Sequence, residues 1–108
     1  MSLLLMNSGL QLLGVYSIAS ITAGTPTQLT NLRCKKVVIQ TDAANASVGS
    51  DGTIVAVGNS TVDADSVPPK VIAMLYPTQR EEFFVDNANA LYVDATVTGA
   101  AISYAVFG

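Results

Sequence analysis

The stretch Ala90-Leu-Tyr-Val-Asp-Ala-Thr-Val97 decides the fold class of this chain, because apolar and polar residues alternate along it. One face takes Leu91, Val93, Ala95 and Val97, and the other takes Tyr92, Asp94 and Thr96. Thr98 and Gly99 can turn the chain, after which Ile102, Tyr104 and Val106 resume the alternation. A period of two residues is typical of a strand with one buried face. Two such segments joined at a glycine predict a β-hairpin.

Shorter segments upstream carry the same signals and are separated by turn residues. We expect strands over residues 34–41, 53–59, 70–76 and 80–85, an exposed Ala/Asn/Ser/Gly-rich loop over 42–52, and a second loop closed by Pro68-Pro69. Short strands with regularly spaced turns are typical of sandwiches and barrels. The sequence therefore predicts an all-β fold, a compact antiparallel β-sandwich of jelly-roll type with an extended apolar N-terminal arm.

The N-terminal region is apolar, and residues 1–32 contain no charged side chain. We assign residues 1–24 to an arm that includes a first strand, and residues 25–108 to the sandwich. Residues 10–22 fit both helical and strand spacing, and their β-branched side chains favour a strand. Glycine and polar residues interrupt the segment, so we expect no membrane span. The arm is too short to bury itself, so we expect it to bind a neighbouring subunit through Leu3, Leu4, Leu5, Met6, Leu10, Leu12 and Leu13; a disordered start is the alternative.

The composition limits the classes of molecule that this chain is expected to bind. Only 12% of the 108 residues are charged, half are hydrophobic, and the net charge is −3 with five basic residues. Scattered basic residues in such small number cannot follow a phosphate backbone, so we expect no nucleic-acid partner. A charge fraction about half of the usual value leaves apolar surface exposed, which favours contact with another protein.

Residues that usually carry catalysis are missing or badly spaced. The chain has no histidine, which excludes imidazole-assisted nucleophiles and imidazole metal ligands. Asp63 and Asp65 would share a face in a strand, but their Ser/Thr/Val-rich context favours solvated turn residues. We therefore expect no enzyme activity, no catalytic residue, no cofactor and no metal.

Three weaker signals remain. Cys34 lies between Arg33 and Lys35, which would lower its pKa, although a half-buried strand residue is the favoured interpretation. Loop oxygen donors at Asp42, Asn45, Asp51 and Asp63 do not have the spacing of a calcium loop. Two glycosylation sequons begin at Asn45 and Asn59, but so short a motif is common by chance.

The run Cys34-Lys-Lys-Val-Val-Ile-Gln-Thr41, followed by Asn45 and by Val55-Ala-Val-Gly-Asn59, resembles the first half of a family of small virion proteins of tailed bacteriophages. The resemblance continues through Leu75 and Pro77, Phe83-Phe-Val-Asp-Asn87 and Leu91-Tyr-Val-Asp-Ala95, so that it covers residues 25–108.

This resemblance implies a capsid decoration (cement) protein that binds the outside of a phage head and clamps neighbouring capsid subunits. The implied partners are the major capsid protein and further copies of the chain, with a homotrimer preferred and a homodimer second. The implied location is the capsid surface of the virion, after synthesis in the host cytoplasm. A tail, neck or head-fibre module that binds the host is the alternative.

Overall fold

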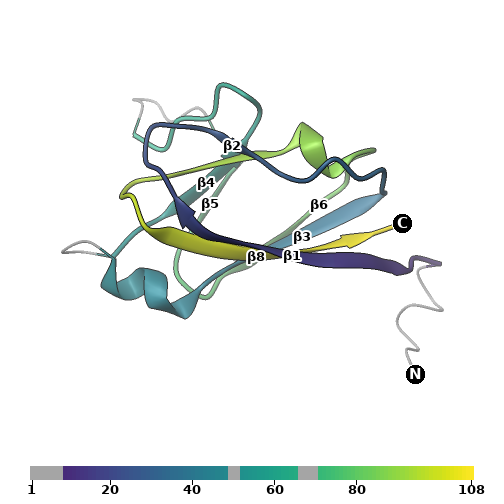
Figure 1. Cartoon of the computed structure of the whole chain (residues 1–108), viewed down its shortest axis with the longest axis horizontal. Coiled ribbons are helices and arrows are strands. Elements are labelled where there is room, and N and C mark those ends of the chain that lie inside the picture. Colours follow the sequence, from purple (N-terminus) through teal and green to yellow (C-terminus); the bar gives the residue numbers. More distant parts are fainter. Residues whose placement is uncertain (1–8, 49–51, 66–70) are drawn as a thin grey trace.

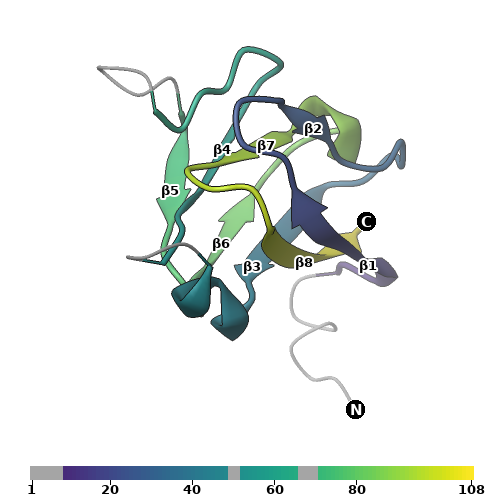
Figure 2. The same cartoon turned by 60° about the vertical axis from the view of Figure 1, so that its left-hand side comes forward.

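Two four-stranded antiparallel sheets pack face to face in the computed structural model, which describes residues 9–48, 52–65 and 71–108 (Figures 1 and 2). Sheet A has the order β1 (Leu12–Ile21), β8 (Ala100–Phe107), β3 (Lys36–Thr41) and β6 (Arg80–Phe83). Sheet B has the order β2 (Thr27–Gln28), β7 (Tyr92–Ala95), β4 (Val55–Gly58) and β5 (Ala73–Leu75). Two short 3₁₀ helices, η1 (Ala43–Ser47) and η2 (Ala88–Ala90), lie in the connections. The predicted all-β sandwich is confirmed.

The core lies between the sheets and takes alternate residues from each strand. Burial of a Val or Ile side chain contributes about 1.5–3 kcal/mol, so these rows provide most of the stabilising energy. The fully or almost fully buried core residues of the two inner faces include Ile21, Val37, Ile39, Ile102 and Val106 from sheet A and Val55, Val57, Leu75 and Val93 from sheet B.

The hairpin expected around Gly99 is wrong, although both of its strands exist. β7 pairs with β4 and β2, whereas β8 pairs with β1 and β3, so the connection crosses from sheet B to sheet A. Gly99 makes this crossing with a φ of 111°, a region that favours glycine, and its N–H donates to the carbonyl of Ile21 at 3.0 Å. The alternation of apolar and polar residues indicates only that one face of each strand is buried. In a sandwich, two strands that face each other bury the same residues as two strands that pair.

Residues 12–21 form a strand, which decides between the two interpretations of the N-terminal region. β1 pairs with β8 and is a full member of sheet A, with irregular register between Leu12 and Gly14 and between Ile18 and Ile21. The apolar segment at positions 1–8 lies outside the described residues.

The outer face of sheet B is covered by the chain itself. Val62 and Ala64, from the segment after β4, are buried against Ala56, and Val71, Met74 and Tyr92 pack around them. β4 is therefore buried on both faces, with Val55 and Val57 in the core between the sheets and Ala56 under this cover. This cover also explains why Asp94, expected on a solvated face, is fully buried. Its carboxylate accepts backbone hydrogen bonds from Gly24 at 2.8 Å and from Ala64 at 2.9 Å.

Candidate functional site: the outer face and free edge of sheet A

The outer face of sheet A keeps its side chains exposed or half-buried on all four strands. The register aligns Val15, Ala105, Val38 and Glu82 in one row across the sheet. Ser17, Ser103, Gln40 and Arg80 form the next row. We call this surface the outer face; it consists of Val15, Ser17, Ala19, Lys36, Val38, Gln40, Arg80, Glu82, Ala101, Ser103, Ala105 and Phe107, none of which is buried.

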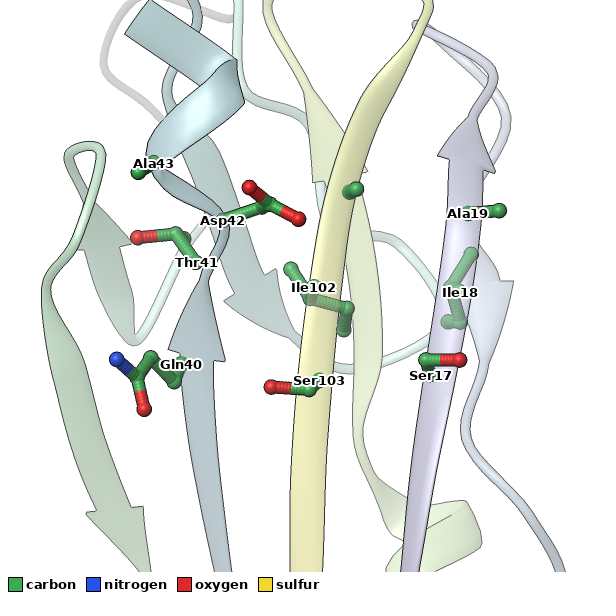
Figure 3. Close-up of a pocket in the computed structure, with 10 residues that line it drawn as sticks. Ser17, Ile18, Ala19, Gln40, Thr41, Asp42, Ala43, Ile102 and Ser103 are labelled. Carbon is green, nitrogen blue, oxygen red and sulfur yellow. The ribbon is translucent and has the colours of Figure 1, made fainter.

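Small side chains along β8 hollow this surface. A shallow trough of about 550 Å³ runs past Ala101 and Ser103, with Ser17 and Ala19 on one side and Gln40 on the other. Figure 3 shows Ser103 on β8 between the side chains of β1 and β3. A second hollow of about 380 Å³ continues the surface past Val15, Val38, Ala105 and Phe107. Ala and Ser leave space above the strand that a side chain of another molecule can fill.

Charge is confined to one side of the outer face. The Lys36 Nζ atom on β3 lies 3.7 Å from the Glu82 Oε2 atom on β6 and 5.0 Å from the ring centroid of Phe107. β1 and β8 contain no charged residue. The half of the face formed by these two strands is therefore neutral, and little desolvation of charge opposes its burial by a partner.

β1 also has a free edge, since β8 is its only neighbour in sheet A among residues 9–48, 52–65 and 71–108 (Figures 1 and 2). The carbonyls of Ala101 and Phe107 accept from Asp42 and Lys35 on the β3 side of β8. Alternate residues of a strand direct their main-chain groups to opposite sides. The N–H and C=O groups of Ile102, Tyr104 and Val106 therefore point towards β1. Their register partners are Ile18, Tyr16 and Gly14. The N–H and C=O groups of Val15 and Ser17 therefore point to the free edge.

The other sheet edges differ from β1 in length and charge. Among the described residues, β2 has two residues and β5 has three, while β6 carries Arg80, Glu81 and Glu82. Short or charged edge strands resist pairing with another chain. β1 has ten residues with no charge and no proline, and Leu12 and Val15 are 51% and 66% exposed. Between Gly14 and Ile18, where its register with β8 is regular, β1 has no charge, proline or bulge that would block such pairing.

Three of the seven predicted interface residues, Leu10, Leu12 and Leu13, lie within the described part of the chain. Leu12 and Leu13 are exposed at the start of β1, where Leu12 is opposite Phe107, and Leu10 is half-buried beside them. Leu3, Leu4, Leu5 and Met6 lie outside the described residues. The sequence-based prediction missed the small side chains at Ala101, Ser103 and Ala105. The alternation of β8 already contained them, but neither their exposure nor their neighbours follow from one strand.

The structure decides two of the weaker chemical signals. Cys34 is half-buried, as the favoured interpretation expected, although it precedes β3 and is not part of the strand. Burial, together with the negative charge of Asp86, raises the pKa of its thiol, contrary to the alternative in which the flanking cations lower it. The Cys34 Sγ donates to the carbonyl of Val85 at 3.3 Å. Asn45, the first sequon position, is 1% exposed, so the loop expected to be exposed over 42–52 holds a buried side chain.

Asp63 and Asp65, the acidic pair singled out in the sequence, lie in the segment after β4 and not in a strand. The Asp63 carboxylate accepts from the backbone N–H of Asp65 at 3.0 Å, which is a local turn interaction. Within residues 9–48, 52–65 and 71–108, no three His, Cys, Asp or Glu residues cluster as a metal site would require. No helix within these ranges has the length and hydropathy needed to span a membrane.

Comparison with known proteins adds no relative: no family model matches the chain, and no curated protein matches its sequence. We therefore infer the function from two surfaces of the molecule, the outer face of sheet A and the free edge of β1.

Proposed function

We propose that this chain is a structural virion protein that binds the outside of a phage capsid and clamps neighbouring capsid subunits. It acts mechanically, without catalysis or a cofactor. The proposed partners are the major capsid protein and further copies of the chain. The proposed location is the capsid surface, after synthesis in the host cytoplasm.

The observation that supports a binding role is the difference between the two outer faces. Sheet B is covered by the chain's own segment around Val62 and Ala64, whereas sheet A leaves Val15, Val38 and Phe107 accessible. A neutral, hollowed sheet face gains free energy when apolar area is removed from water, by about 25 cal/mol per Å². Such a face suits a flat protein surface better than a small molecule, because the hollows are shallow and open.

The capsid as the partner is inferred from the resemblance of residues 25–108 to phage virion proteins. A capsid presents many identical sites, so a weak contact per copy becomes strong attachment when linked copies bind together. Each protein bound across a junction adds buried area that opposes separation of the capsid subunits.

Co-sedimentation with mature, decoration-free capsid shells tests this proposal. The wild-type chain is expected to pellet saturably. Ser103→Lys places a charge at the centre of the outer face and is expected to reduce pelleting. Ser60→Lys makes the same change at an exposed position beside the cover of sheet B and serves as the matched control.

A second variant tests the arm. Because β1 is part of sheet A, truncation must spare it, so the variant begins at Gly9 and lacks the apolar residues Leu3 to Met6. Reduced pelleting with unchanged folding would support a binding role for the arm. If the wild-type chain does not pellet, the capsid proposal is wrong, and a tail, neck or head-fibre module is the proposal to test next.

A further inference from the structure

We propose that β1 pairs antiparallel with β1 of a second copy, so that two chains form a two-fold symmetric dimer with one continuous sheet of eight strands. The inference specifies the self-association that is part of the proposed function. It rests on the geometry of β1 alone, and its test needs no capsid.

One side of β1 carries main-chain groups that pair with no described strand. Val15 and Ser17 direct their N–H and C=O groups away from β8, along an edge with no charge and no proline. An extended edge of this kind is a template for strand addition, because pairing converts solvated main-chain groups into ladder hydrogen bonds.

β1 is also complementary to a second copy of itself. The register of β1 with β8 is regular from Gly14 to Ile18 and irregular on both sides. A two-fold axis at Tyr16, the middle of this stretch, places Val15 opposite Ser17 of the partner subunit. Residues that share such a position exchange two N–H···O=C hydrogen bonds, and the symmetry repeats the pair. The isologous contact closes on itself, so it gives a dimer and no filament.

The lack of charge on β1 also favours pairing with a second copy. Antiparallel self-pairing places no like charges together along β1, since the strand has none. The side chains brought together on the outer face are Val15 and Ser17, which are small enough for close approach. The opposite edge, β6, carries the charged residues Arg80, Glu81 and Glu82, and charged edge strands resist pairing with another chain.

The dimer changes the surface proposed for binding. The sheet centre becomes β8-β1-β1-β8, a neutral surface with the charged β6 strands at both margins. One dimer therefore presents two copies of the outer face in a single sheet, which would allow it to contact two neighbouring subunits at once.

Sedimentation equilibrium of the full chain over a range of concentrations tests the proposal. The wild-type chain is expected to reach twice the monomer mass. Ser17→Lys is expected to weaken the dimer at least tenfold, because it places like charges close to the axis. Ser103→Lys is the matched control and is expected to leave the dimer intact. Ser103 is opposite Ser17 on the same face, but its strand, β8, lies between β1 and β3 and has no free edge.

A charge-pair rescue tests the register. Val15→Glu alone is expected to weaken the dimer, because it places a carboxylate beside the axis in each copy. The double variant that combines Val15→Glu with Ser17→Lys is expected to restore the dimer. In this variant the lysine introduced at position 17 of each copy would lie opposite the glutamate introduced at position 15 of the other copy. Circular dichroism of each variant checks that the fold is retained.

Several results would overturn the proposal. A monomeric wild-type chain, or one with three times the monomer mass, would exclude the β1 dimer. Equal dissociation by Ser17→Lys and Ser103→Lys would place the contact on the outer face. Failure of the rescue would exclude the Tyr16-centred register. A dimer that does not bind capsids would leave this inference intact and contradict only the capsid proposal.

Discussion

Asn45 and Ala101 are joined by two hydrogen bonds between one side-chain amide and the main chain of β8. The Asn45 Nδ2 donates to the Ala101 carbonyl at 2.9 Å, and the Ala101 N–H donates to Asn45 Oδ1 at 2.8 Å. The carbonyl of Asn45 also accepts from the N–H of Thr53 at 3.0 Å. A buried side chain in η1 thus attaches the loop after β3 to the start of β8.

We expect Asn45→Asp to destabilise the protein by about 2–4 kcal/mol, because it removes a buried donor and sets a carboxylate oxygen against the Ala101 carbonyl. Asn59→Asp is the matched control: Asn59 is exposed, and its side-chain oxygen only accepts from Thr61. Urea unfolding of both variants checks the prediction. A free energy of unfolding for Asn45→Asp within about 0.5 kcal/mol of wild type, the range of ordinary surface changes, would contradict it.

Asp94→Ala is expected to release the cover of sheet B. The carboxylate holds the N–H groups of Gly24 and Ala64 through its two oxygens, and both donors lose their acceptor in the variant. The Ala64 donor is buried, and leaving it unsatisfied costs about 1–3 kcal/mol. Gly24 is exposed, so water can replace its lost acceptor. Amide hydrogen exchange should show faster exchange at Ala64 and Gly24, while Val57 in β4 stays protected. Asp65→Asn, at an exposed position in the same segment, should leave all three amides unchanged.

Gly14→Ala is expected to disturb the stacking of Tyr16 on Tyr104. A Cβ at position 14 would lie 2.9 Å from the Tyr16 Cε1 and Oη atoms, so the ring must move. The two rings stack with centroids 5.3 Å apart and an interplanar angle of 21°, a contact worth about 0.5–1.5 kcal/mol. Near-ultraviolet circular dichroism should change for Gly14→Ala and stay unchanged for Ser20→Ala, an exposed position of β1. An unchanged spectrum for Gly14→Ala would show that a Cβ at position 14 fits beside the Tyr16 ring without moving it, and would contradict the prediction.

Stability should fall at alkaline pH partly through Tyr104, whose pKa burial raises above its ordinary value of 10.0. The folded state then holds a proton that the unfolded state releases. The stabilising contribution is therefore complete below about pH 10 and is lost as the pH rises through the folded-state pKa. Tyr104→Phe should flatten this decline. It should also cost about 1–2 kcal/mol at neutral pH, because the N–H of Thr30 loses its acceptor at 3.0 Å.

The measurement is the free energy of unfolding between neutral and alkaline pH, in a Cys34→Ala background that removes a second described group with a raised pKa. Tyr76→Phe is the matched control, since Tyr76 is 54% exposed. An equally steep decline in Tyr104→Phe and in its parent would exclude Tyr104 as a source of the pH dependence.

Alternation in the sequence was sufficient to predict the strands, because it reflects a local choice that each residue makes between core and solvent. The segments around Val37, Val55 and Val93 are strands as expected, and β-branched side chains correctly favoured a strand over residues 12–21. Low charge likewise indicated exposed apolar surface, which the structure places on Leu12, Val15 and Phe84.

Tertiary structure alone decided which strands pair and which faces remain open. β1 and β8 come from opposite ends of the described chain, and β7 and β8 separate into different sheets despite their adjacency. Asp94 is buried because a segment some 30 residues away in the sequence donates to its carboxylate. Periodicity shows that one side of a strand is buried but does not identify what buries it. The free edge of β1 exists because the long-range pairing with β8 satisfies only one side of the strand.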